Sequence, residues 1–372
     1  MSLVCQMTSL TFLVGEEVGN PTSGESRFVF NLLRALSRHG AEITLCAAAV
    51  TESACRSLEG EHVRVISMNE KTSSALFQSR LVTGSRALGR KLSKEAIKAG
   101  KCDWYIVFDQ AVAASRYLDK ARKAFICNGE FALLFLGRGF YRSGKALKRL
   151  LSARASGAIL DNAESARLYD MRFANSHFTQ SFMSYIYECQ FEELLYPPVD
   201  PEIFRPSRVL QEDKYVLSMM RNMNEQNLHI LGRIAREIPL KVVGNATVPG
   251  ATSTGVVDDE MLSRLYSEAS FLAFPVVSEF FGYAVAESIS CATPALVMPG
   301  AGPAEIIASG FSGWHASSED EFVARAVQIY REGYDPAFRT RALEMARRFS
   351  MEVVGDGFLS CLEKKMNHCR VA

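Results

Sequence analysis

Short apolar runs alternate with amphipathic segments along most of the 372-residue chain. Near the start, Ser9 to Val14 and Ile43 to Cys46 are apolar runs of strand length. Between them, Phe28 to Arg38 has the apolar spacing of an amphipathic helix, which Gly40 closes. The turn residues from Asn20 to Gly24 predict a loop before this helix. This strand–loop–helix–strand order is typical of the first unit of a Rossmann-like domain.

The alternation continues through the rest of the chain. Strands that alternate with helices predict an α/β protein with parallel sheets. A chain of 372 residues is also long enough for two domains with separate cores. Further strands are predicted at residues 62–66, 104–108, 124–127, 215–219 and 240–243, and further helices at residues 177–185, 261–269, 320–332, 337–348 and 353–366.

The most informative stretch runs from Phe274 to Gly313. An apolar run, Phe271 to Val277, predicts the end of a buried parallel strand. A helical pattern follows from Tyr283 to Cys291, and a second strand is predicted at Ala295 to Met298. A glycine-rich turn then leads into the next helix. The pattern therefore predicts a strand–helix–strand unit.

Two carboxylates flank the start of the predicted helix, since Glu279 and Glu287 are eight positions apart. A helix start preceded by Gly282 presents backbone N–H groups and the positive end of the dipole, which favour a diphosphate. Carboxylates beside it can accept hydrogen bonds from the hydroxyls of a ribose and a hexose. The spacing alone favours an ordinary unit with solvated glutamates, and the whole string favours a sugar-nucleotide site.

This string resembles the donor-binding signature of retaining glycosyltransferases of the GT-B fold, specifically the family 4 group. Two positions depart from that signature, because Phe280 and Ala292 stand where glycine is usual. The residues in register are Glu279, Phe281, Gly282, Glu287, Cys291 and Pro294, followed by Gly302 and Glu305.

The resemblance implies a role for each matching residue. Glu279 would contact the hydroxyls of the donor sugar, Glu287 would contact the ribose, and Arg221 would bind the donor phosphates. The family usually has a lysine five residues after that arginine, and this chain has Gln226. Glu279 and Arg221 are the expected catalytic residues. The other residues expected to contact the donor are Gly24, Gly244, Val257, Phe281, Gly282, Tyr283 and Ala284.

Asn128 stands near the position where many related enzymes have a histidine that faces the donor sugar. An asparagine can donate a hydrogen bond to the donor sugar or the acceptor, but it cannot carry a proton. The alternative interpretation is a simple Asn-Gly turn after a strand, which the pair Asn128–Gly129 alone favours.

The domain boundaries follow from two further segments that are similar to the family. Phe173 to Ser176 matches its Ala-Asn-Ser step, and Leu195 to Pro206 matches the proline-rich segment that connects its two domains. We therefore expect the GT-B fold, with two Rossmann-like doubly wound domains that face a cleft. The expected domains are an acceptor-side domain at residues 1–205, a donor domain at residues 206–348, and a C-terminal helix at residues 349–372 that packs back toward the first domain.

Composition narrows the class of protein. With 48% apolar and 22% charged residues, the chain is expected to be globular and not disordered. The nine cysteines form no C-x-x-C pair, which indicates free thiols in a reducing compartment and argues against a disulfide framework or zinc site. No apolar run reaches transmembrane length, and Leu10 to Val14 is too short for a signal-peptide core. We therefore expect a cytoplasmic protein.

The net charge of +1 conceals a basic region. Residues 71–154 contain eighteen Lys and Arg against five Asp and Glu, a local charge of +13. The basic segments at residues 89–101 and 137–151 also contain leucines, which favours contact with an anionic membrane surface or a phosphate-bearing acceptor. The alternative is a solvated helix face. Nucleic acid binding is supported by no motif.

The function implied by the resemblance is retaining transfer of a hexosyl group from a UDP- or GDP-sugar to a glycan or lipid-linked acceptor. The pathway expected is the synthesis of cell-surface polysaccharide or glycolipid. Enzymes of this group generally need no metal or other cofactor, and no side chain of this chain is assigned as a nucleophile. The alternatives are a GT-B epimerase or phosphorylase, and a degenerate protein that binds a nucleotide sugar or a partner without turnover. Gln226 and Asn128 favour the last.

Overall fold

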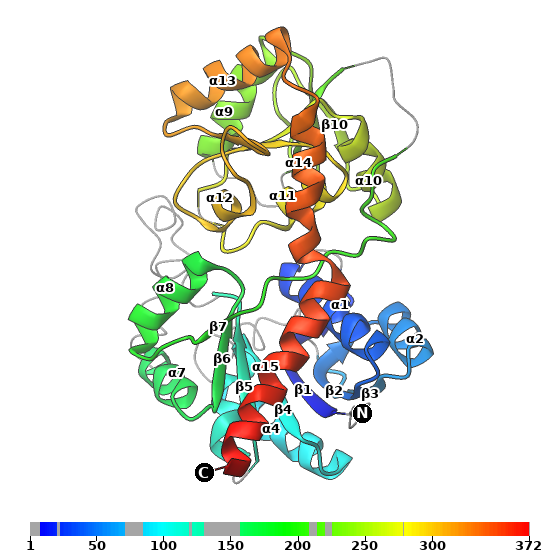
Figure 1. The fold of residues 1–372 in the computed structure, drawn as a ribbon, viewed down its shortest axis with the longest axis vertical. Coiled ribbons are helices and arrows are strands. Elements are labelled where there is room, and N and C mark those ends of the chain that lie inside the picture. The colour runs from blue at the N-terminus through cyan, green and yellow to red at the C-terminus, as the bar shows by residue number, and fades with distance from the viewer. Residues whose placement is uncertain are drawn as a thin grey trace. The chain divides into compact units, whose positions relative to one another are not determined.

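The structure is a computed structural model, and it describes residues 8–20, 23–70, 85–118, 121–129, 157–207, 214–219, 225–277 and 279–371 (Figure 1). The chain forms two compact units. The first unit combines Met1–Pro198 with Val354–Ala372, and the second unit is Val199–Val353. The divisions expected from sequence lie at residues 206 and 349.

The first unit is built on a parallel sheet of seven strands in the order β3-β2-β1-β4-β5-β6-β7. The strands are β1 (Ser9–Val18), β2 (Glu42–Val50), β3 (Arg64–Ser67), β4 (Trp104–Phe108), β5 (Lys123–Cys127), β6 (Met171–Ala174) and β7 (Glu193–Leu194). Its helices are α1 (Gly24–Arg38), α2 (Glu52–Gly60), α4 (Ser85–Ala99), the 3₁₀ helix η1 (Asp109–Tyr117), α7 (Ala158–Ala166), α8 (His177–Tyr187) and most of α15 (Met351–Val371).

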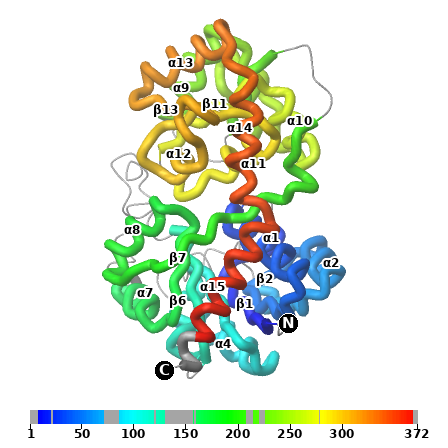
Figure 2. The backbone as a smooth tube through the Cα atoms, in the orientation of Figure 1, coloured from blue at the N-terminus to red at the C-terminus, as the bar shows by residue number. Residues whose placement is uncertain are grey.

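The last helix completes the first unit (Figure 2). In α15, the ring of Phe358 lies 5.0 Å from that of Phe173 in β6. Asp356 contacts His39, at the end of α1, with 2.9 Å between Oδ1 and Nε2. Phe358 is 1% exposed, and burial of such a side chain contributes about 1.5–3 kcal/mol. The residues after 353 are therefore part of the core of the first unit.

The second unit is built on a parallel sheet of six strands in the order β10-β9-β8-β11-β12-β13. The strands are β8 (Val216–Met219), β9 (Leu240–Val243), β10 (Thr252–Gly255), β11 (Phe271–Phe274), β12 (Ala295–Val297) and β13 (Gly313–His315). The helices are α9 (Glu225–Ala235), α10 (Asp259–Glu268), α11 (Tyr283–Ser290), α12 (Gly302–Ile306), α13 (Glu319–Glu332), α14 (Ala337–Ala346) and the 3₁₀ helix η3 (Arg347–Phe349).

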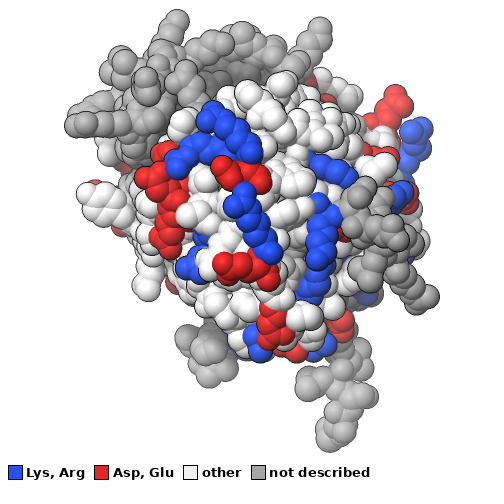
Figure 3. Space-filling model, turned by 90° about the horizontal axis from the view of Figure 1, so that it is seen from above, with Lys and Arg blue, Asp and Glu red and all other residues white. Residues whose placement is uncertain are grey.

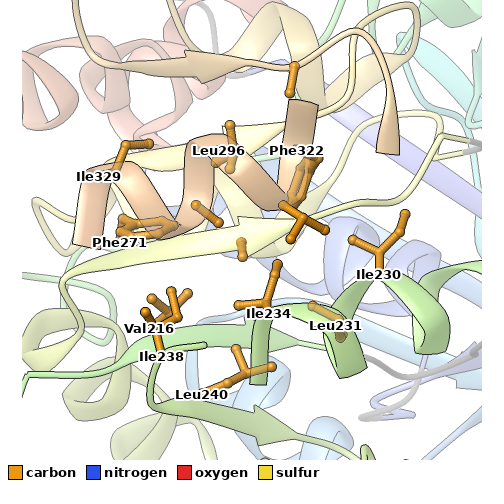
Figure 4. Packing of buried hydrophobic residues seen from close by; sticks show 14 of the residues in the cluster. Val216, Ile230, Leu231, Ile234, Ile238, Leu240, Phe271, Leu296, Phe322 and Ile329 are labelled. Carbon is orange, nitrogen blue, oxygen red and sulfur yellow. The ribbon is translucent and has the colours of Figure 1, made fainter. Parts of the chain in front are cut away.

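Successive side chains of the central strands point to opposite faces of the sheet, so the second unit has an apolar layer on each face. On one face, Phe271 and Leu296 pack with Ile234 from α9 and Phe322 from α13 (Figure 4). The intervening residues, such as Leu272, point to the opposite face and are also fully buried. Both faces of the central strands are therefore covered, as the unbroken apolar pattern predicts.

Both sheets have the doubly wound order of Rossmann-like domains, in agreement with the expected fold class. None of the helices in the described ranges is long and apolar enough to span a bilayer. On the face drawn in Figure 3, basic and acidic side chains are interspersed. Ion pairs of the second unit, such as Arg233–Asp320 and Arg331–Glu237, have this mixed character.

Candidate functional site

The strand order of the second unit places a switch point between β8 and β11. These neighbouring strands are followed by connections that leave the sheet in opposite directions, because β9 and β10 lie on one side and β12 and β13 on the other. In open α/β sheets, ligands bind at such a point, beyond the carboxyl ends of the strands. The loop that follows β11 leads to Glu279 and then to α11. The stretch identified from sequence therefore begins at the edge where this topology places a ligand.

This loop is locked against the turn before α12. The Gly302 N–H donates to the Glu279 carbonyl at 3.0 Å. A Cβ on Gly302 would lie 2.0 Å from the Phe280 carbonyl oxygen, so that backbone approach requires glycine. A Cβ on Gly282 would lie 2.8 Å from Cγ of Pro303, and Gly282 also has a φ of +98°. Two glycines thus fix the backbone on both sides of Phe280.

The same loop forms the start of α11. Gly282 is its N-cap, in the left-handed region, and no side chain caps the helix there. The first N–H groups of any helix have no partner within it, and the helix dipole makes this end positive. Gly282 leads directly into Tyr283 and Ala284, whose amides belong to this first turn. The helix start therefore presents donors suited to an anion.

Aromatic side chains pack against the loop at Glu279–Gly282. Phe281 is 3% exposed, and its ring centroid lies 5.4 Å from that of Tyr283 and 5.5 Å from that of Phe349. Arg348, beside Phe349, donates to the backbone carbonyls of Glu305 and Ile306 in α12. Phe281 therefore has a packing role, with its side chain inside the protein. Phe280, where the family usually has glycine, is buried as well, at 6% exposed.

The two carboxylates differ in environment. Glu279 is partly exposed, whereas Glu287 is 1% exposed, on the second turn of α11. The Tyr266 hydroxyl donates to Oε2 of Glu287 at 3.1 Å. Tyr266 lies in α10 and is fully buried, so Glu287 is held by a contact between two helices. Sequence analysis did not identify Tyr266, because tyrosines of this kind are frequent in apolar helix faces.

Gly244 and Val257 lie at the same edge of the sheet, beyond β9 and β10. The Gly244 N–H donates to the Gly255 carbonyl at 2.9 Å, which joins the ends of these strands. Val257 is partly buried, and Asp258 caps α10 by accepting from the Met261 N–H at 2.8 Å. The loop from Gly255 to Asp258 is therefore held by a hydrogen bond at each end.

Two positions, 221 and 226, are those where the family has its phosphate-binding cations. Arg221 lies outside the described residues. Gln226 is exposed, and its Nε2 donates to Oε1 of Glu319 at 2.7 Å. The position where the family usually has lysine is therefore occupied by a neutral side chain engaged with a carboxylate.

Gly24 and Asn128 belong to the first unit. Gly24 begins α1, and the preceding Ser23 caps the helix by accepting from the Ser26 N–H at 3.1 Å. Asn128 follows β5, and its backbone N–H donates to Oδ2 of Asp109 at 2.8 Å. Both polar atoms of the Asn128 side-chain amide are buried and have no hydrogen-bond partner among the residues that the structure describes.

A further polar residue, Glu16, lies near the end of β1 and was not identified from sequence. Its carboxylate accepts from the Ser23 hydroxyl at 2.5 Å and from Nε2 of Gln110 at 2.8 Å. Burial raises the pKa of the Glu16 carboxyl, and the hydrogen bonds from Ser23 and Gln110 oppose that rise. Two adjacent glutamates at the end of an apolar strand form no motif, so only the fold reveals the partners of Glu16.

Thiols near these residues are not activated. Burial raises the pKa of the Cys291 thiol to about 12, and it raises the pKa of the Cys127 thiol well above its ordinary value. Both thiols are therefore neutral at physiological pH and poor nucleophiles. All seven described cysteines are free, in agreement with the sequence analysis.

The basic region of the first unit is partly neutralised where it is described. Arg86 and Arg116 pair with Asp161, Lys91 pairs with Glu70 at 2.6 Å, and a further pair links Lys98 to Glu95. Such paired side chains are typical of a solvated helix face. Residues 137–151, the second basic segment, lie outside the described ranges.

One family model matches part of the second unit. Residues 211–332 match the family model described as Glycosyl transferases group 1. A search of curated protein sequences gives no match.

Solved glycosyltransferase structures share the fold over nearly the whole chain. HepE from Anabaena, in complex with UDP and glucose, is 16% identical with a TM-score of 0.69, covering 96% of this chain and 100% of its own. Sucrose-phosphate synthase from Thermosynechococcus elongatus is 14% identical with a TM-score of 0.73, covering 97% and 100%. The catalytic domain of starch synthase IV from Arabidopsis thaliana, bound to ADP and acarbose, is 10% identical with a TM-score of 0.69, covering 97% and 100%.

At these identities the shared structure establishes the fold, and the family model adds a similarity at residues 211–332 of the second unit. The doubly wound sheets and the locked loop before α11 agree with both. The chain therefore has the GT-B fold, and its second unit is similar to the Glycosyl transferases group 1 family.

Proposed function

We propose that the protein transfers a hexosyl group from a nucleotide sugar to a glycan or lipid-linked acceptor, with retention of the anomeric configuration. The observation that carries this proposal is the Glu279–Gly282 loop, which Gly302 locks at the uncapped start of α11. A diphosphate requires fixed donors at a positive helix end, and this loop supplies them beside a switch point of the sheet.

In this proposal, the donor diphosphate binds the amides of Gly282, Tyr283 and Ala284. The partly exposed Glu279 accepts hydrogen bonds from the sugar hydroxyls, and Glu287 accepts from the ribose. Glu287 is preorganised for that task because the Tyr266 hydroxyl fixes one carboxylate oxygen at 3.1 Å. The backbone near Gly244 and Val257 meets the base, a contact that needs no particular side chain.

Stabilisation of the leaving diphosphate is the main catalytic demand. We assign it to Arg221 and to the amides at the start of α11. The lysine that usually supplies a second cation is replaced by Gln226, which donates to Glu319. A charge-assisted hydrogen bond to phosphate contributes about 1.5–3 kcal/mol, so donor binding is expected to be roughly tenfold weaker than with both cations.

The Cys291 thiol at the end of α11 is not an activated nucleophile, since burial raises its pKa to about 12. The proposal therefore assigns no covalent intermediate on the protein. UDP- and GDP-sugars are the donors to test first, because HepE was solved with UDP and glucose. The proposed acceptors are intermediates of cell-surface polysaccharide or glycolipid synthesis, which the protein meets as a cytoplasmic enzyme. The basic region at residues 71–154 is the part proposed to contact an anionic membrane.

The test is release of free nucleoside diphosphate from UDP-glucose, UDP-galactose, GDP-mannose and ADP-glucose, with and without EDTA. Glu279→Gln should lower this rate at least about tenfold, because a charge-assisted hydrogen bond is lost. Glu260→Gln, at an exposed carboxylate in the first turn of α10, is the matched control and should leave the rate unchanged. Retention is read from the anomeric coupling of the product by NMR. Equal rates for Glu279→Gln and wild type would contradict the proposal.

A second candidate is a protein that binds a nucleotide sugar without turnover. The contact between Gln226 and Glu319 favours it, because a clamp side chain is neutral and engaged elsewhere. Thermal stabilisation by UDP that persists in Glu279→Ala, with no diphosphate release from any donor, would support this candidate over the enzyme.

A further inference from the structure

The carboxyl edge of the first unit's sheet carries a second set of polar residues. Strands β1, β4 and β5 are neighbours, with Leu13 beside Val107 and Phe108 beside Ile126. Glu16, Gln110 and Asn128 each follow these paired positions by two or three residues. The register therefore brings these three side chains to one edge, at the switch point between β1 and β4.

One hydrogen bond joins Gln110 to Glu16, and another joins Asn128 to Asp109, the residue before Gln110. Nε2 of Gln110 donates to Oε1 of Glu16 at 2.8 Å, and the neighbouring Asp109 accepts from the Asn128 N–H at 2.8 Å. A Cβ on Gly15 would lie 2.6 Å from Cβ of Gln110, so the glycine before Glu16 allows η1 to approach β1 this closely. The chain thus holds Gln110, which is 1% exposed, against the carboxylate.

The partners of Glu16 are unusual for a desolvated carboxylate. Its two described partners, the Ser23 hydroxyl and the Gln110 amide, are neutral, and each donates to a different carboxylate oxygen. A carboxylate has about four acceptor sites, so two bonds leave room for more. Burial raises the pKa of the Glu16 carboxyl, because it disfavours the ionised form and neither described partner carries a positive charge.

Asn128 provides an independent observation. Both Nδ2 and Oδ1 of its side chain are buried and make no hydrogen bond to any described residue. An unsatisfied buried amide costs about 1–3 kcal/mol, so a residue kept in this state is expected to serve a ligand. Its backbone, by contrast, is fully engaged, since the carbonyl accepts from Nδ2 of Asn175 at 3.4 Å.

We propose that Glu16 and Asn128, with Gln110 as support, form a subsite that orients adjacent hydroxyls of a hexose in the acceptor. The carboxylate accepts from one hydroxyl, and the Asn128 amide donates to or accepts from the next. Glu16 is a binding and positioning residue and transfers no proton. The inference rests on the proposed function, because an acceptor subsite has a meaning only if a sugar is transferred.

The test separates transfer from hydrolysis, in which water replaces the acceptor. The full chain is given the nucleotide sugar that it hydrolyses fastest, together with methyl α-glucoside, methyl α-galactoside or methyl α-mannoside as the probe. Glu16→Gln and Asn128→Ala should lower kcat/KM for transfer to the probe by about tenfold to a hundredfold. Donor hydrolysis and UDP affinity should stay within about twofold, because neither depends on the acceptor subsite.

Glu17→Gln, one residue along β1, is the matched control and should change neither rate. Asn128→Ala carries the test alone if Glu16→Gln fails to fold, as judged by its melting transition. An equal fall of transfer and hydrolysis would overturn the inference, as would hydrolysis by the wild type with transfer to none of the three probes. A wild type that neither binds UDP nor releases diphosphate would overturn the proposed function first, and this inference with it.

Discussion

Ala292, where the family resemblance leads one to expect glycine, gives the sharpest stability prediction. It follows the C-cap of α11 with a φ of +58°, in the left-handed region. The Thr293 N–H donates to the Ser288 carbonyl at 2.9 Å, and the Ala292 N–H to the Ile289 carbonyl at 3.0 Å. These two bonds are the Schellman pattern, whose C′ position favours glycine.

We expect Ala292→Gly to stabilise the second unit. The left-handed region costs an alanine about 1–2 kcal/mol, and glycine avoids this cost. Glycine also makes the unfolded chain more flexible, which offsets about 0.4–1 kcal/mol. The net gain is therefore about 0.5–1 kcal/mol, and a unit of this length should melt about 1–4 °C higher.

The assay is thermal unfolding followed by circular dichroism, with UDP affinity measured beside it. Ala326→Gly is the matched control, because Ala326 lies buried inside α13. It should lower stability by about 1 kcal/mol or more, since glycine is unfavourable within a helix. An unchanged or lower melting temperature for Ala292→Gly would refute the argument from backbone strain.

Three further predictions follow from contacts in the two units. Gly302→Ala should weaken UDP binding at least about tenfold, because its Cβ would meet the Phe280 carbonyl at 2.0 Å and displace the loop; unchanged affinity by calorimetry would show that the loop tolerates the shift. Gln226→Lys should tighten UDP binding up to about tenfold at low salt and less at high salt. Pairing of the new lysine with Glu319 would reduce this gain, and the double variant with Glu319→Gln tests that competition. Burial raises the folded-state pKa of Glu16, so its contribution to stability is largest below the unfolded pKa of about 4.3 and is lost as pH rises through the folded pKa. Glu16→Gln should therefore gain melting temperature relative to wild type between pH 4 and pH 7, and a wild-type advantage that grows with pH would contradict this sign.

The sequence indicates the elements whose apolar pattern is strong. The predicted strand at residues 104–108 matches β4, and the predicted helix from Phe28 to Arg38 forms the larger part of α1. The exposed edge strand β10 (Thr252–Gly255) was missed because its residues, Thr-Ser-Thr-Gly, carry no apolar alternation. β7 was missed because it has two residues.

In the candidate site, too, the sequence indicates some residues and not the contacts that they make. Gly302 falls in the signature, yet its near contact with Phe280 depends on how two loops pack and is invisible in the sequence. Tyr266 meets Glu287 from twenty-one positions away, and Gln226 meets Glu319 from ninety-three. Such pairs are set by tertiary packing, so local pattern identifies one partner and gives no sign of the other.

The first unit needs α15 to complete its core, so the order of synthesis affects when this unit can fold. The ribosome synthesises Val199–Val353 before the residues that bring Phe358 to Phe173. Domains usually fold in the order in which they are synthesised, but here the first unit lacks part of its core until the residues after 353 have been made. A chain truncated after Val353 would therefore contain the whole second unit but a first unit in which Phe173 lacks its partner Phe358, and this exposed apolar surface would favour chaperone binding.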